Sequence, residues 1–151
     1  MHRFWLFVHL LGIILWIGGG LATMVAGVAA KQFPPEARLA AYRLTSAVQR
    51  VLVGPGAVAV LVSGVVLSMR FMRDGMVPGW LTMMMAAGIP AAAVALGAAL
   101  PTAARLGRLE LDARGELPPQ FAGLRARLVK MASIAGGLGL IALAAGTLLR
   151  S

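Results

Sequence analysis

The segment FWLFVHLLGIILWIGGGLATMVAGVAA, residues 4–30, decides the fold of this chain. It contains no Asp, Glu, Lys or Arg, and it is long enough to cross about 30 Å of hydrocarbon as an α-helix. Three further uncharged apolar runs follow at about residues 51–69, 80–104 and 131–149. Because lipid offers the backbone no hydrogen-bond partner, such spans must be helical. The sequence therefore predicts an all-α membrane protein with four transmembrane helices.

The composition excludes several classes of protein. Of the 151 residues, 60% are hydrophobic and 13% are charged, and the mean hydropathy is +0.86. A water-soluble domain of this length could not cover so much apolar surface. The absence of Cys excludes disulfides and thiolate metal sites, and two His are too few for a three-histidine zinc site in one chain. We expect residues 1–151 to form a single transmembrane domain, with polar loops at 31–50 and 105–130.

The basic residues predict the orientation of the helices. Ten of the 14 Lys and Arg lie in loops 31–50 and 105–130, and the other four lie at the two termini and in the second loop. The positive-inside rule then places loops 31–50 and 105–130 in the cytoplasm and both termini outside, as an antiparallel bundle. The net charge of +9 becomes a cytoplasmic collar that can contact anionic lipid headgroups. Its membrane-surface members are Arg38, Arg43, Arg50, Arg105, Arg108, Arg125, Arg127 and Lys130. Aromatic residues are not interleaved with these arginines and lysines, so we do not expect a nucleic-acid partner.

The two cytoplasmic loops resemble each other. Pro34-Pro35 is followed by Glu36 and Pro118-Pro119 by Gln120, and each pair leads into a basic amphipathic stretch. Pro followed by Glu or Gln is typical of a helix start. We therefore expect the second and fourth helices to begin about 15 residues before the membrane. The similarity indicates a possible 2+2 repeat of helical hairpins.

Small residues and prolines indicate how the spans pack. Small residues recur four apart, which lets helix backbones approach closely in lipid. Two prolines, Pro55 and Pro90, lie inside the second and third spans and are expected to distort them. The small-residue rows are Gly19, Thr23 and Gly27; Ala59 and Ser63; Gly64 and Ser68; Ala135 and Gly139; Ala142 and Gly146.

His9 is the one ionisable side chain well inside a predicted span. Ionisable residues within membrane helices mark functional sites by default. A neutral imidazole is a good ligand for haem iron or copper. The alternative is that His9 makes a hydrogen bond across the bundle or to lipid headgroups.

Six of the nine methionines surround the second loop, on the same predicted side of the membrane as His9. Thioethers are soft ligands that suit Cu(I), and a Met can also serve as the second axial ligand of a haem. The alternative is that these methionines are flexible apolar filler. They are Met69, Met72, Met76, Met83, Met84 and Met85.

The stretch from Val8 to Gly20, VHLLGIILWIGGG, resembles the first helix of several bacterial membrane families. These are a family of four-helix integral membrane proteins of unknown function, the CopD-type copper-resistance proteins and the HemJ-type protoporphyrinogen oxidases. The second helix, with Arg50, Pro55 and Ser63-Gly64, is also similar to theirs. The resemblance implies a four-helix fold in the bacterial inner membrane, with His9 matching the haem-ligating histidine of the HemJ type. The chain lacks the second intramembrane His and the basic residue in the third helix of that oxidase family. We therefore favour a non-enzymatic role.

Three functional hypotheses remain open. The first is an accessory subunit that packs in a larger membrane assembly or with a second copy of itself. The second is a membrane protein that binds haem b or Cu(I) through His9 near the outer leaflet, where two copies of the chain could form a bis-His site across a two-fold axis. The third is a carrier of a small lipophilic solute.

Overall fold

The computed structural model describes residues 2–73 and 75–149, apart from the side chain of Arg70. Arg150, which enters the charge count, lies outside the described residues. Within these ranges the chain forms helices and turns and no strand. Four helical stretches are long and apolar enough to cross a membrane, which confirms the predicted all-helical class: His2–Gln32, Pro35–Arg73, Gly79–Leu106 and Gln120–Leu148.

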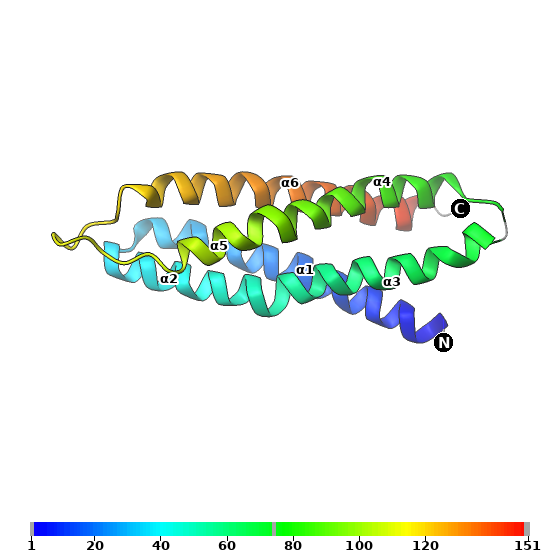
Figure 1. Ribbon diagram of the computed structural model, residues 1–151, viewed down its shortest axis with the longest axis horizontal. Coiled ribbons are helices and arrows are strands. Elements are labelled where there is room, and N and C mark those ends of the chain that lie inside the picture. The colour runs from blue at the N-terminus through cyan, green and yellow to red at the C-terminus, as the bar shows by residue number, and fades with distance from the viewer. Residues whose placement is uncertain (1, 74, 150–151) are drawn as a thin grey trace.

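The long helices follow the long axis of the molecule (Figure 1). The start of α1, the α3–α4 connection and the end of α6 lie at one end, which we call the terminal end. The α1–α2 and α5–α6 connections lie at the other end, which we call the loop end. The α-helices are α1 (His2–Ala29), α2 (Pro35–Val48), α3 (Gly54–Arg73), α4 (Gly79–Val94), α5 (Leu100–Leu106) and α6 (Gln120–Leu148). A short 3₁₀ turn, η1 (Ala30–Gln32), closes α1.

The helices pack chiefly as two pairs, α1 with α3 and α4 with α6. Contacts between the pairs are fewer, and at the loop end they run mainly through α2 and α5. One buried cluster lies at the loop end and includes Leu39, Tyr42, Leu106 and Phe121 from α2, α5 and α6. A second cluster, around Trp16, lies near the middle and is built mostly from alanines. The loop end thus has the larger buried side chains.

Two π-helical turns interrupt the second and third long helices. The first, η2, covers Gln49–Val53 and the second, η3, covers Ala95–Ala99. Each ends two residues before a proline, Pro55 in one case and Pro101 in the other. Proline has no N–H and its ring collides with the carbonyl four residues earlier, so a wider turn relieves both problems without ending the helix. The expected distortion at Pro55 takes this form.

The other prolines lie inside α4, beside the second π turn and at the starts of α2 and α6. Pro90 lies inside α4, which remains α-helical from Gly79 to Val94. Pro101, whose π turn is equivalent to that at Pro55, was not singled out by the sequence analysis. Pro35 occupies the first turn of α2, and Pro119 directly precedes α6. The helices thus begin at the two Pro-Pro pairs, as predicted.

The backbones of α1 and α3 approach each other closely at two glycines. A Cβ atom added to Gly12 would lie 2.9 Å from the carbonyl oxygen of Gly56, and one added to Gly56 would lie 2.8 Å from the amide nitrogen of Trp16. The predicted small-residue row of α1 begins at Gly19, which also packs closely against the second long helix. A Cβ atom on Gly19 would lie 2.8 Å from Val53 Cγ2. In α6 the row is looser, and nothing lies within 4 Å of a Cβ built on Gly139.

Large apolar side chains face outward along the full length of α1. Phe7 is 62% exposed, Ile14 67% and Val25 63%. A continuous apolar surface of this kind is costly in water and favourable in lipid. It is consistent with a membrane-embedded bundle.

Candidate functional site

His9 lies on the face of α1 that packs against α3. Residues 9, 12, 16, 19 and 23 follow the three-and-four spacing of one helical face. Gly12, Trp16, Gly19 and Thr23 are buried on this face, and His9 extends the same face toward the terminal end, where it is half-buried. Its imidazole therefore points into the α1–α3 interface.

The imidazole has a defined partner. His9 Nδ1 lies 2.9 Å from Ser63 Oγ, on α3. Ser63 is fully buried, and its hydroxyl donates its single proton to the carbonyl oxygen of Ala59. In the tautomer with the hydrogen on Nδ1, the imidazole donates to this hydroxyl, whose own proton stays on the Ala59 carbonyl. The second ring nitrogen, Nε2, is then the unprotonated atom of the neutral imidazole.

Three glycines make room for this arrangement. A Cβ atom on Gly64 would lie 3.4 Å from His9 Cε1, so the ring packs directly against the α3 backbone. The Gly12–Gly56 approach, one turn from His9 along α1, holds the two helices at the short distance that the hydrogen bond requires. The site is therefore a product of close helix packing.

The six methionines proposed as soft ligands face several directions. Met69, Met72, Met76 and Met83 are between 47% and 79% exposed. Met84 points toward α6, where its sulfur would lie 3.0 Å from a Cβ on Gly146. Met85 lies on the opposite side of α4 and lines a groove. Adjacent methionines thus serve different packing surfaces.

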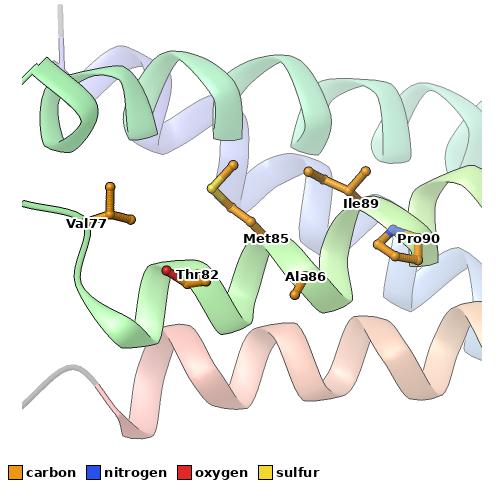
Figure 2. Close-up of a pocket in the computed structure, with 6 residues that line it drawn as sticks. All are labelled: Val77, Thr82, Met85, Ala86, Ile89 and Pro90. Atoms are coloured by element: carbon orange, nitrogen blue, oxygen red, sulfur yellow. The ribbon is translucent and has the colours of Figure 1, made fainter.

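That groove runs along α4 near the terminal end (Figure 2). It has a volume of about 490 Å³ and is open on one side. Met85 and Ile89 point from α4 away from α6, and Pro90 lies further along α4 (Figure 2). The lining is apolar except for Thr82, whose hydroxyl approaches its own helix start at Pro78 O, at 3.4 Å. The full set of lining residues is Val77, Thr82, Met85, Ala86, Ile89 and Pro90.

The residues that the structure describes contain no group of three or more His, Cys, Asp or Glu that could hold a metal ion. A metal or haem iron held by this chain would therefore depend on His9, on thioethers or on a second subunit.

A second buried polar pair lies nearer the loop end. Gln49 is 3% exposed, and its Nε2 donates to Thr23 Oγ1 at 3.2 Å. Thr23 in turn donates to the carbonyl oxygen of Gly20 at 2.8 Å. The other amide oxygen, Gln49 Oε1, has no hydrogen-bond partner within the described part of the chain. A buried acceptor without a hydrogen-bond partner lowers the stability of the fold. Gln49 is also the first residue of the π turn η2.

The sequence analysis missed both polar partners for different reasons. Ser63 was recognised only as a small packing residue, because nothing in the local sequence links it to His9, 54 positions away. Gln49 carried a local signal. It falls on the helical face that also carries Leu39, Tyr42, Ser46 and Val53, all of which are buried and most of which are apolar. An amide at that spacing predicts a buried polar group.

The basic residues of the predicted collar divide into two sets. Arg38, Arg43 and Arg125 make hydrogen bonds within the molecule. The longest of these joins Arg43 to the carbonyl oxygen of Leu109, at 3.4 Å. The remaining members are exposed: Arg50, Arg105, Arg108, Arg127 and Lys130.

Comparisons with protein-family models, with curated proteins and with solved structures found no match to this chain.

Proposed function

We propose that this protein is a bacterial inner-membrane protein that binds haem b through Nε2 of His9, near the outer leaflet. The four long helices would cross the membrane as an antiparallel bundle of two hairpins, with both termini outside. The concentration of Lys and Arg at the loop end supports this orientation. The pairing of α1 with α3 and of α4 with α6 supports the hairpin arrangement.

The hydrogen bond between His9 and Ser63 carries the proposal. Histidines that ligate metals almost always donate their other ring N–H to a neighbouring acceptor, which fixes the tautomer and the ring orientation. Ser63 provides such an acceptor because its own proton is held by Ala59 O. The imidazole is thereby prepared as a ligand through Nε2. A second ligand to the iron would be His9 of a second copy or a thioether.

The test is the visible spectrum of the detergent-purified protein, oxidised and dithionite-reduced, from cells supplied with haem and copper. We expect a Soret band that sharpens on reduction and is lost in His9→Ala. His2→Ala is the matched control, because His2 is exposed and lies seven residues earlier on the same helix. Metal analysis of the same sample distinguishes haem iron from Cu(I). A featureless spectrum without bound copper would refute the proposal.

Ser63→Ala separates an oriented ligand from a packing residue. Loss of an outer-shell partner typically weakens metal binding about 10–100-fold, so we expect lower haem occupancy and an altered spectrum. Ser68→Ala is the control, because Ser68 is equally buried in α3 and its hydroxyl donates to Val65 O. Equal effects of the two substitutions would indicate a loss of packing instead.

The apolar groove beside α4 favours a second candidate function. An accessory subunit could receive a helix of a larger membrane assembly there, and a carrier could receive a lipophilic solute there. An accessory role predicts copurification with that assembly and normal assembly of His9→Ala. Substitution of Ile89 by Trp would fill the groove and prevent copurification.

A further inference from the structure

A basic hollow lies at the loop end, between the end of α1 and the start of α6. Its volume is about 390 Å³. Among the described residues, its lining includes three basic side chains and no carboxylate. The lining residues are Lys31, Arg38, Leu117, Pro118, Pro119, Phe121, Ala122 and Arg125.

Two of the three basic side chains are held in place by the fold. Arg38 donates from Nε to the carbonyl oxygen of Ala30 at 3.0 Å, and from Nη2 to those of Lys31 and Phe33 at 2.6 and 3.0 Å. These bonds hold the guanidinium against η1 and the residue that follows it. Arg125 donates from Nε to the hydroxyl of Tyr42 at 2.7 Å.

Other nitrogens of the two guanidiniums make none of these hydrogen bonds and are free to bind a ligand. Arg125 donates to Tyr42 from Nε only, so the N–H groups of both terminal nitrogens are available as donors to a ligand. The guanidinium of Arg38 keeps Nη1, and Lys31 is an exposed ammonium at the rim. A planar, fixed guanidinium with two free terminal nitrogens suits bidentate contact with a phosphate.

The Tyr42 ring positions Arg125 from the opposite hairpin. Tyr42 is 4% exposed and packs edge-on against Phe121, with ring centroids 5.3 Å apart. Residues of α2 and α6 thus build the hollow together, and the buried Tyr42 holds the guanidinium of Arg125 in position.

The remaining wall of the hollow is apolar, and the exposed apolar face of α1 leads toward Lys31. Leu117, Pro118 and Phe121 line the hollow itself. Met24 and Val28, which are 60% and 59% exposed, lead along α1 to Lys31. A ligand with an anionic head and an apolar tail matches a basic hollow that lies beside an exposed apolar helix face.

We propose that this hollow binds the phosphate group of an anionic phospholipid from the leaflet at the loop end. The phosphate contacts Arg125, Lys31 and the free nitrogen of Arg38, and an acyl chain lies along the exposed face of α1. The inference rests on the proposed membrane placement and is independent of any cofactor at His9.

The test measures lipid binding to the full-length protein in detergent by native mass spectrometry, at about 0.15 M ionic strength. We expect dioleoyl phosphatidylglycerol to bind at least tenfold more tightly than dioleoyl phosphatidylcholine. Lys31→Gln and Arg125→Gln should each weaken phosphatidylglycerol binding about fivefold. Arg127→Gln is the matched control, because Arg127 is exposed on α6 and does not line the hollow, and it should change binding less than twofold.

Two further measurements separate the explanations. Tyr42→Phe removes the hydrogen bond to Arg125 but keeps its charge. Comparison of its thermal unfolding midpoint with that of Arg125→Gln shows whether a loss of binding in Arg125→Gln comes from local misfolding. Inorganic phosphate should compete only weakly, because it lacks the apolar tail. Equal binding of the two lipids, or equal losses in Arg125→Gln and Arg127→Gln, would overturn the proposal. Full competition by inorganic phosphate would replace the lipid with a free anion and overturn it as well.

Discussion

The two ends of the bundle are organised differently. At the loop end, α2, α5 and α6 share one core with large side chains, and Tyr42 and Arg125 connect the two helix pairs. At the terminal end, α1 packs with α3 and α4 packs with α6, and an apolar groove remains beside α4. The comparison indicates that the loop end holds the bundle together, whereas the terminal end keeps separate surfaces available. His9, near the start of α1, lies toward the terminal end.

The largest expected effect tests whether the loop-end core carries the stability. Leu106 is 1% exposed, so Leu106→Ala should lower the free energy of unfolding by about 2–5 kcal/mol through lost contacts and a residual cavity. Leu140→Ala is the control, because Leu140 is 55% exposed on the outer face of α6. Unfolding of the detergent-solubilised protein, followed by circular dichroism, measures both. A loss below about 1 kcal/mol for Leu106→Ala would contradict the assignment of a shared core at this end.

An intermediate effect is expected where α1 meets α3. Gly12→Ala places a methyl group against the backbone of Gly56, which cannot move aside easily, and should cost about 1–3 kcal/mol. Gly18→Ala is the matched control six residues later, since nothing lies within 4 Å of its added Cβ, and it should cause no loss. If the two variants unfold alike, the α1–α3 pair is looser than its backbone approach indicates. If His9 binds haem, Gly12→Ala should also lower haem occupancy.

The smallest effect concerns the buried amide. Gln49→Met removes the unpaired Oε1 and keeps nearly the same volume, while Thr23 retains its bond to Gly20 O. Because an unsatisfied buried acceptor costs about 1–3 kcal/mol, we expect stability to be unchanged or to rise by about 1 kcal/mol. The same unfolding measurement checks this. A clear loss of stability would mean that Oε1 has a partner, such as a bound water, in the folded protein.

Local patterns in the sequence were sufficient for some features of the fold. Uncharged runs predicted four long helices, and the Pro-Pro pairs predicted where α2 and α6 begin, because both depend on neighbouring residues alone. A distortion near Pro101 follows from the same local rule as that near Pro55, whereas its π-helical form does not. Pro90 differs from Pro55 in one respect, since α4 keeps α-helical hydrogen bonding around it and no π turn precedes it.

The candidate sites were predicted less completely. His9 stood out as an ionisable residue in an apolar run, but its partner Ser63 depends on how α1 lies against α3. The grouping of Lys31, Arg38 and Arg125 around one hollow could not be predicted from a count of loop charges. Arg127, two positions from Arg125, has the same charge and lies outside that lining.

The helical class, the four long apolar helices and the gathering of basic residues in two of the loops follow from the sequence alone. Each follows from the cost of burying charge and unpaired backbone groups in an apolar medium, which acts on short segments one at a time. The pairing of the helices, the contact of His9 with Ser63 and the grouping of cations around one hollow arise from the tertiary structure. These depend on close contacts between residues far apart in the chain, and the glycine and proline positions set those contacts through backbone geometry.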